Sequence, residues 1–346
     1  MQIAVVCPHL LPAFPHLGVG GTEYRLENLA HGLQAAGLDF FVVCPRRDPE
    51  LVREYPFPVL EVDCWPTRTA SLQAGADGGD YHRRVLELLA CERPDLVFLQ
   101  ASEDPARFHT LAARIIVTDN CPCGKRRFEI RDYGNVRYRF VSEAQRRSLV
   151  ESAEEERLSF MVHTGMAARE YQLETEPGDY YLWVANLNWG FEKKGLDVFL
   201  GLAEQLSEKS FVAYGSGNAE LEESLRLFER SHANFEFGGQ LARGCQHTAA
   251  FRGARAFVHV TRVGEAFGRT VLEALTKGTP VLGNSDGGTP EQIDADGGII
   301  CDTRDALAAS LEALGGFDRR RVFASAQRFH VRHEIEALIR AAGELF

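Results

Sequence analysis

The chain has 346 residues, of which 45% are hydrophobic and 25% are charged, the balance of a globular protein with about two domains. This composition excludes a disordered, collagen-like or disulfide-scaffold chain. Acidic residues outnumber basic residues by 49 to 38, and the resulting net charge of −11 argues against nucleic-acid binding over the whole surface.

The chain has none of the expected marks of export or membrane insertion. No apolar run approaches the ~18 to 20 residues needed to cross a bilayer, and Met1–Cys7 lacks the basic region and cleavage site of a signal peptide. Several of the eight cysteines stand inside apolar runs, as buried free thiols do (Cys7, Cys44 and Cys301). We therefore expect a cytoplasmic protein in a reducing compartment.

Short β-rich runs alternate with helical periodicity along the chain. In the first half the strand-like runs are Ile3–Cys7, Phe40–Cys44, Leu96–Gln100, Ile115–Thr118, Arg139–Val141 and Phe160–Val162. After the polar stretch Glu170–Asp179 they are Tyr180–Ala185, Phe211–Tyr214, Phe257–Val260, Pro280–Gly283 and Gly298–Cys301. Between them, apolar residues three and four apart predict helices at Thr22–Ala36, Leu196–Ser207, Glu220–Phe228 and Thr270–Lys277. The chain after Arg304 has a helical pattern throughout.

Strands that alternate with helices predict parallel sheets covered on both faces. The two similar halves predict an α/β protein of two Rossmann-like, doubly wound domains that face each other across a cleft. In such sheets ligands bind beyond the carboxyl ends of the strands, so we expect functional residues in the loops that follow strands.

The most informative segment is Gly264–Leu275, which follows the strand-like run Phe257–Val260. Gly268 and Thr270 suit the start of a helix, whose N-terminus would offer unpaired N–H groups to a phosphate. Glu265 precedes this helix and Glu273 lies on its second turn, so the two carboxylates would hydrogen-bond sugar hydroxyls on either side of the phosphate. The plainer alternative is a capping acid and a solvated helix charge.

This segment resembles the E-x7-E signature of retaining glycosyltransferases of family four, which have the GT-B fold. Further matches follow in the family's order: Gly20-Gly21-Thr22-Glu23, Trp183–Leu187 with Lys193-Lys194-Gly195-Leu196-Asp197, Tyr214-Gly215-Ser216-Gly217, Lys277-Gly278-Thr279-Pro280-Val281 and Gly287-Gly288-Thr289-Pro290-Glu291. The resemblance is dense over about Tyr180–Ile293 and thinner in the first half.

The resemblance implies an acceptor-binding domain at 1–165, joined by a C-terminal helix at about 330–346, and a nucleotide-sugar domain at 166–329. It implies that Glu273 binds the ribose, that Glu265 faces the donor sugar and that Lys194 neutralises the diphosphate. The implied catalytic residues are Glu265, Lys194 and Arg269. The implied donor-binding residues are Gly20, Gly21, Asn186, Lys194, Gly215, Ala266, Phe267, Gly268, Arg269, Thr270 and Glu273.

The chain departs from the family pattern at two positions. Asn186 stands where many members place an arginine on the phosphates, and Arg269 is our candidate to supply that charge. Asn120 stands where many members have an acceptor-side histidine, and the adjacent Asp119 is a candidate for that role. A surface arginine and a different acceptor geometry are the alternatives.

Eight basic residues against three acids lie between Lys125 and Arg147, interleaved with aromatic residues. This cluster, represented by Arg126 and Arg127, suggests an anionic acceptor such as a lipid phosphate or a nucleic acid, and peripheral contact with the inner membrane face. A solvated loop and helix face is the equally weighted alternative.

Three other signals are weaker. Asp294-Ala295-Asp296 has the form of a metal-binding D-x-D but precedes two glycines, which favours a turn. Cys121-Pro122-Cys123 has no second cysteine pair at zinc-ribbon spacing. The glycines at 18–21 stand too far from their strand for a dinucleotide fingerprint, which leaves only a weak NADP interpretation with Arg46 and Arg47.

We therefore expect a retaining glycosyltransferase that moves a sugar from a nucleoside-diphosphate sugar, such as a UDP-sugar, to a hydroxyl, without a metal or other cofactor. In the family, attack is described as occurring on the face that the leaving group departs from, with the departing phosphate oxygen as base. Two alternatives remain open: a sugar-nucleotide epimerase of GT-B fold, and a non-catalytic sugar-nucleotide-binding protein.

Overall fold

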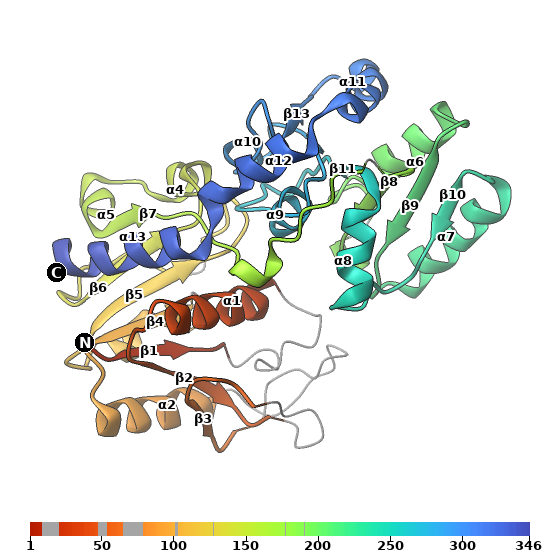
Figure 1. The fold of residues 1–346 in the computed structure, drawn as a ribbon. Coiled ribbons are helices and arrows are strands. Elements are labelled where there is room, and N and C mark those ends of the chain that lie inside the picture. Colours follow the sequence, from red (N-terminus) through yellow and green to blue (C-terminus); the bar gives the residue numbers. More distant parts are fainter. Residues whose placement is uncertain are drawn as a thin grey trace. The chain divides into compact units, whose positions relative to one another are not determined.

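A computed structural model describes residues 1–8, 21–47, 54–64, 79–100, 103–126, 128–176, 178–189 and 191–346. The chain forms two compact units, which are coloured along the sequence in Figure 1. Unit 1 comprises Met1–Ala168 and Phe329–Phe346, and unit 2 comprises Arg169–Arg328.

Unit 1 is built on a parallel sheet of seven strands in the order β3-β2-β1-β4-β5-β6-β7. The strands are β1 (Ile3–Val6), β2 (Phe40–Pro45), β3 (Val59–Val62), β4 (Leu96–Gln100), β5 (Arg114–Asp119), β6 (Val136–Phe140) and β7 (Ser159–Met161). The helices are α1 (Gly21–Ala35), α2 (Gly79–Glu92), α3 (Pro105–Phe108), α4 (Glu143–Leu149), α5 (Ala153–Leu158) and the C-terminal α13 (Val331–Glu344).

Helices cover both faces of this sheet. Alternate side chains of each strand point to opposite faces, so both sets are buried. Ile3 and Val5 of β1 pack in one core with α1 and α13, whereas Ala4 and Val6 pack in a second core with α2. This explains why β1 is a continuous apolar run.

Unit 2 has a parallel sheet of six strands in the order β10-β9-β8-β11-β12-β13. The strands are β8 (Tyr180–Val184), β9 (Ser210–Tyr214), β10 (Phe235–Phe237), β11 (Ala254–His259), β12 (Val281–Gly283) and β13 (Gly298–Ile300). The helices are α6 (Leu196–Gln205), α7 (Ala219–Ser231), α8 (Cys245–Arg252), α9 (Arg269–Leu275), α10 (Thr289–Gln292), α11 (Leu307–Ala313) and α12 (Arg319–Ser325).

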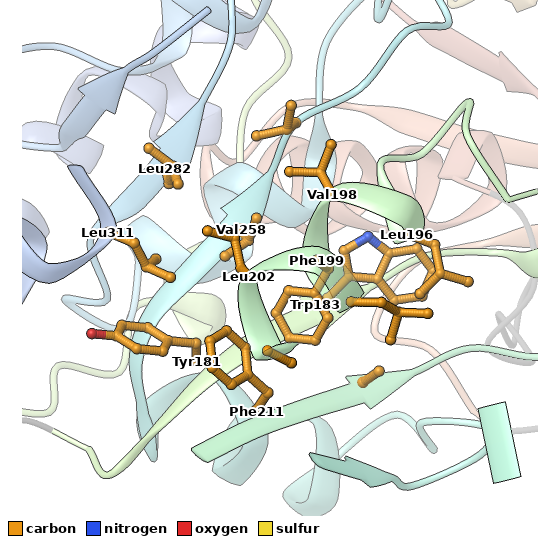
Figure 2. Close-up of a cluster of buried hydrophobic side chains, with 14 of the residues drawn as sticks. Tyr181, Trp183, Leu196, Val198, Phe199, Leu202, Phe211, Val258, Leu282 and Leu311 are labelled. Atoms are coloured by element: carbon orange, nitrogen blue, oxygen red, sulfur yellow. The ribbon is translucent and has the colours of Figure 1, made fainter. Parts of the chain in front are cut away.

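A core of aromatic and aliphatic side chains anchors α6 on the sheet of unit 2 (Figure 2). Leu196 and Phe199 of α6 lie beside Trp183 of β8 and Phe211 of β9 in this cluster. The start of α6 is thereby fixed at the carboxyl end of β8.

The prediction of two parallel α/β sheets is confirmed, and every predicted strand-like run contains a strand. Two further strands were not predicted, β3 and β10. Both are short and lie at sheet edges, and an exposed glutamate interrupts the apolar residues of each, so neither has the apolar run of an interior strand.

The cysteines are free thiols, and Cys7, Cys44 and Cys301 are buried as predicted. Cys91 and Cys245 are exposed. Within the described part of the chain, no helix is both long and apolar enough to span a membrane.

Candidate functional site

Three loops at the carboxyl edge of the unit 2 sheet carry the charged residues of the candidate site. Lys194 lies in the loop after β8, Glu265 in the loop after β11 and Asp286 in the loop after β12. The ammonium of Lys194 forms an ion pair with Glu265, and both side chains are less than one fifth exposed. Two residues that are 71 positions apart in the chain therefore form one charged pair.

The main chain around Lys194 is held from two sides. The buried indole of Trp183 donates its Nε1–H to the carbonyl oxygen of Lys194 at 2.9 Å. Gly195 then adopts a φ of +71°, and its α-carbon packs so closely on the carbonyl of Val260 that a side chain there would collide. The ring of Trp189 lies 5.6 Å from the Lys194 ammonium, within the range of a cation–π contact.

Charge at Glu265 is maintained despite its burial. Burial alone would raise the pKa of this carboxyl, but the neighbouring Lys194 and His259 lower it below its ordinary value. His259 Nε2 lies 4.0 Å from Glu265 Oε2. Burial lowers the pKa of His259 from 6.5 to about 4, so this imidazole is neutral at pH 7.

Glu273 on α9 is a buried, paired carboxylate and not a solvated helix charge. Its Oε1 accepts a hydrogen bond from Arg243 at 2.7 Å, and His247 Nε2 lies 3.2 Å from its Oε2. Burial would raise the pKa of Glu273, but Arg243 and His247 hold it well below its ordinary value. The group is thus an ionised acceptor with a fixed position.

The segment between the two glutamates is well packed. Ala266 and Phe267 are buried, and Arg269 and Thr270 begin α9 with half-buried side chains. The Gln292 side chain accepts the N–H of Gly268 at 2.7 Å and donates to its carbonyl at 2.9 Å. The implied donor-binding residues 266–270 therefore form the end of the β11 loop and the start of α9, and Glu273 lies further along the same helix.

Two other implied donor residues shape the neighbouring loops. Asn186 is exposed, and its side-chain oxygen accepts the N–H of Asn188 at 2.8 Å. Gly215 is buried, and an added Cβ would press on Leu187 at 3.0 Å. Neither residue places a charge at the site, so Asn186 does not replace the arginine that is common in the family.

The acceptor-side residues lie in unit 1. Asp119 is buried and accepts the N–H of Cys121 at 2.7 Å, a contact that shapes the turn after β5. Asn120 donates to Gln100 at 3.3 Å. Gly21 is the first residue of α1, while Gly20 and Arg127 lie outside the described residues.

Most of the described basic cluster in unit 1 is paired within the protein. Arg126 pairs with Glu155 at 2.8 Å and Arg139 is buried against Glu334 at 2.7 Å. Further ion pairs join Arg131 to Glu129, Arg146 to Glu143 and Glu156, and Arg147 to Glu143. The net positive charge of this surface is therefore lower than the sequence suggests.

The D-x-D segment forms the predicted turn. Asp294 Oδ1 accepts the N–H groups of Asp296 and Gly297, and its other oxygen pairs with Arg328. In the described ranges no group of three or more His, Cys, Asp and Glu side chains is arranged to hold a metal ion.

Four residues of the unit 2 site were missed in the sequence: Arg243, His247, His259 and Asp286. Asp286 immediately precedes the noted glycine pair, so its position in a loop after a strand was a usable signal. Arg243 and His247 lie in a segment with no motif, and only the packing of α8 beside α9 brings them to Glu273.

Unit 1 also has a polar group at its sheet edge that was not predicted. His82 pairs with the buried Glu103 at 2.5 Å, and burial raises the pKa of Glu23 to about 7. Glu23 and Glu103 follow β1 and β4, where ligand-binding loops are expected in such sheets, and His82 lies on α2.

Unit 2 contains a stretch that is similar to a known protein family. Residues 178–315 match the family described as glycosyl transferases group 1. The matched stretch covers less than half of the chain and lies within unit 2. It contains Lys194, Glu265, Glu273 and Asp286 and takes up most of unit 2.

One curated relative is the trehalose synthase of Rubrobacter xylanophilus, 30% identical over 145 residues. The match takes in 40% of this chain and 35% of the relative's length, so it spans about a third of that protein.

Solved structures extend the similarity to both units. The pneumococcal O-GlcNAc transferase GtfA, in complex with UDP and GlcNAc, superposes with a TM-score of 0.72 at 11% identity and covers 100% of this chain and 99% of its own. Anabaena Alr3699/HepE, in complex with UDP-glucose, gives 0.70 at 13% identity, with 99% and 100% covered. The fold of the chain is therefore GT-B.

Proposed function

We propose that this protein transfers a sugar from a nucleoside-diphosphate sugar to a hydroxyl of an acceptor, with retention of configuration and without a catalytic metal. The observation that carries the proposal is the pairing of Lys194 with Glu265 in a domain whose next helix holds the ionised Glu273. This places one cation and two carboxylates on adjoining segments.

Each charge has a task in the proposed reaction. Cleavage of the bond between the sugar and the diphosphate builds negative charge on the leaving group, which a fixed cation such as Lys194 stabilises without reorganising. Glu273 would accept hydrogen bonds from the ribose hydroxyls, and Glu265 would accept them from the sugar. Pairing with Lys194 keeps Glu265 ionised before the donor enters.

The departing phosphate oxygen would take the proton of the attacking hydroxyl on the same face of the sugar, so the reaction needs no separate base. Arg269 is our candidate for the second cation on the phosphates, since Asn186 carries no charge. The neutral His259 lies behind Glu265 and is buried, which suits a supporting role.

A UDP-sugar is the donor that we propose to test first, because two of the similar solved structures hold UDP-glucose or UDP with GlcNAc. The acceptor site would lie on unit 1, near Asp119 and Asn120. An anionic acceptor and contact with the inner membrane face remain part of the hypothesis, although the internal ion pairs of Arg126 and its neighbours weaken its electrostatic basis.

The test is a binding and turnover screen with UDP-, GDP- and ADP-glucose. Thermal shift measures donor binding, and released nucleoside diphosphate measures slow hydrolysis. We expect one donor to stabilise the wild type and to be slowly hydrolysed, and Glu273→Ala to abolish the stabilisation because the ribose loses its acceptor. Glu273→Gln serves if the alanine variant fails to fold.

Glu208→Ala is the matched control, because Glu208 is a surface carboxylate of the same unit, 62% exposed. Binding without release would favour a sugar-nucleotide-binding protein, and an epimerised sugar nucleotide formed without acceptor would favour an epimerase. If none of the three donors stabilises the wild type, the proposal is wrong for these nucleotides.

A further inference from the structure

The loop after β12 holds the segment that carries Glu265. Asp286 in this loop accepts hydrogen bonds from three successive main-chain N–H groups, those of Val263 at 3.2 Å, Gly264 at 3.0 Å and Glu265 at 3.0 Å. The hydroxyl of Thr261 donates to the same carboxylate at 2.7 Å. One side chain thus fixes the main chain from residue 261 to residue 265.

Neighbouring residues of the same loop complete this attachment. Asn284 accepts the N–H of Thr261 at 3.0 Å and donates to its carbonyl at 2.8 Å. The N–H of Gly288 donates to the carbonyl of Glu265 at 2.7 Å. Gly287 has a φ of +55° and lies so close to the main chain of Glu265 that any Cβ would collide with it.

The other side of the segment is tied to the loop of Lys194. The N–H of Arg262 donates to the carbonyl of Lys193 at 2.8 Å. The guanidinium of Arg262 donates to the main-chain carbonyl of Glu192 at 2.9 Å and pairs with the carboxylate of Asp197 at 3.0 Å. The Glu265 segment therefore lies between two loops and is bonded to each. The Lys194 loop bonds the side chain of Glu265, whereas the β12 loop bonds its main chain.

A carboxylate that accepts several N–H and O–H donors forms charge-assisted hydrogen bonds, which are about twice as strong as neutral ones. The carboxylates of Asp286 and Glu265 repel each other. This repulsion works against the lowering of the Glu265 pKa by Lys194 and His259. The contact is favourable only through the main chain. This arrangement suits a role in placing Glu265 and not in charging it.

We infer that Asp286 is a positioning residue for Glu265, holding the main chain of residues 263–265 so that the Glu265 carboxylate meets Lys194 and the donor sugar. The inference rests on the proposed function for the role of the sugar contact. Asp286 would thus act on the reaction through Glu265 and not through the substrate.

The chain offers a matched control in Asp302. This carboxylate accepts the N–H of Ser285 at 2.8 Å and its hydroxyl at 2.6 Å, so it fixes the same loop from the side away from Glu265. Asp286→Asn and Asp302→Asn are equal chemical changes on the two sides of one loop. An amide cannot accept at both ends, so each variant loses part of its hydrogen bonding.

The first measurement is amide hydrogen exchange in peptides covering residues 261–266. We expect Asp286→Asn to exchange about tenfold faster there than the wild type, because hydrogen bonds to a charged acceptor protect these amides. Asp302→Asn should exchange as the wild type in the same peptides. Unchanged exchange in Asp286→Asn would show that Asp286 does not hold this main chain.

The second measurement reports the Lys194–Glu265 pair without any donor. Acetic anhydride acylates free lysine amines, and pairing with Glu265 shields Lys194. We expect faster acylation of Lys194 in Asp286→Asn, relative to the exposed Lys209 as internal standard, and no change in Asp302→Asn. Faster exchange with unchanged acylation would overturn the positioning role.

The third measurement is turnover of the sugar nucleotide that the wild type hydrolyses. We expect Asp286→Asn to lower kcat by up to about 100-fold with little change in KM, because misplacement of a catalytic group acts on the chemical step. An unchanged kcat would also overturn the role. Thr261→Val, which removes one of the bonds, should shift all three readouts in the same direction and replaces Asp286→Asn if that variant does not fold.

These measurements distinguish failure of the proposed function from failure of the role given to Asp286. If the wild type binds and hydrolyses none of the three donors, the glycosyltransferase proposal fails, while exchange and acylation still decide whether Asp286 places Glu265 against Lys194.

Discussion

The side chains of the unit 2 site are charged although they are largely buried. Glu265 and Glu273 keep their charges because each has a basic partner from another loop, Lys194 and Arg243. Burying an unpaired carboxylate is so costly that it would become protonated instead. His259 has no comparable compensation, and its burial excludes the charged form.

The state of His259 predicts a dependence of stability on pH. The unfolded chain protonates this imidazole below pH 6.5, whereas the folded protein protonates it only near pH 4, so unfolding becomes easier as the pH falls through this window. In His259→Gln the fall in unfolding free energy between pH 6.5 and 4 should be shallower, by up to about 1.4 kcal/mol per pH unit.

Urea unfolding at half-unit pH steps measures this slope. The groups that face His259 are Glu265, Lys194 and Asp286, and they are present in both proteins. Equal slopes would mean that the pKa of His259 is the same in the folded and the unfolded chain.

At the scale of elements, the site depends on close approach between loops. The first residue before α6, Gly195, has a left-handed conformation and lies against the end of β11. A glycine is required there for two reasons: its left-handed φ, and the lack of space for a side chain. The contact sets how near Lys194 comes to Glu265.

Gly195→Ala separates these two requirements when it is compared with Gly37→Ala. Gly37 has a similar φ of +66°, but a Cβ there would meet nothing within 4 Å among the described residues. Gly37→Ala should therefore cost about 1–2 kcal/mol of unfolding free energy, from backbone strain alone. Gly195→Ala should cost more, because the Val260 carbonyl must also move.

Chemical denaturation measures both costs, and thermal shift with the bound donor shows whether the site survives. We expect donor binding to weaken in Gly195→Ala and to persist in Gly37→Ala. Equal costs in the two variants would contradict the close contact.

At the scale of the molecule, the C-terminal helix α13 is part of unit 1 through a buried charge network. Glu334 of α13 pairs with Arg25 of α1 at 3.4 Å and with Arg139 of β6 at 2.7 Å. It also accepts the N–H of Gly165 at 2.7 Å. These contacts join four segments that are up to 309 residues apart in the chain.

Removing the charge of Glu334 should destabilise unit 1 selectively. Glu334→Gln removes the negative charge that pairs with two buried arginines, and breaking a buried pair in this way costs about 3–5 kcal/mol. Hydrogen exchange should accelerate in α1 and α13 and remain unchanged in α6 and α9 of unit 2. Glu336→Gln, an exposed position on the same helix, should have little effect.

Acceleration in both units would show that they unfold as one. Unchanged exchange in α1 and α13 would contradict the stabilising role of the network.

The sequence by itself determined the α/β class, the alternation of strands and helices and the loops that carry Lys194, Glu265 and Glu273. This was possible because burial on both faces of a parallel sheet imposes continuous apolar runs, such as Ile3–Val6, and because glycines mark the loops that follow them. The edge strands β3 and β10 escaped prediction, since an edge strand needs less apolar surface.

The tertiary structure alone decided which charges meet. Arg243 and His247 reach Glu273 because α8 packs beside α9, and Asp286 reaches the main chain of residue 265 from the loop after the neighbouring strand. Likewise, Arg126 and Arg139 looked like free positive charge but pair with Glu155 and Glu334. Such partners are set by packing between segments distant in the chain, and no local pattern of residues encodes that geometry.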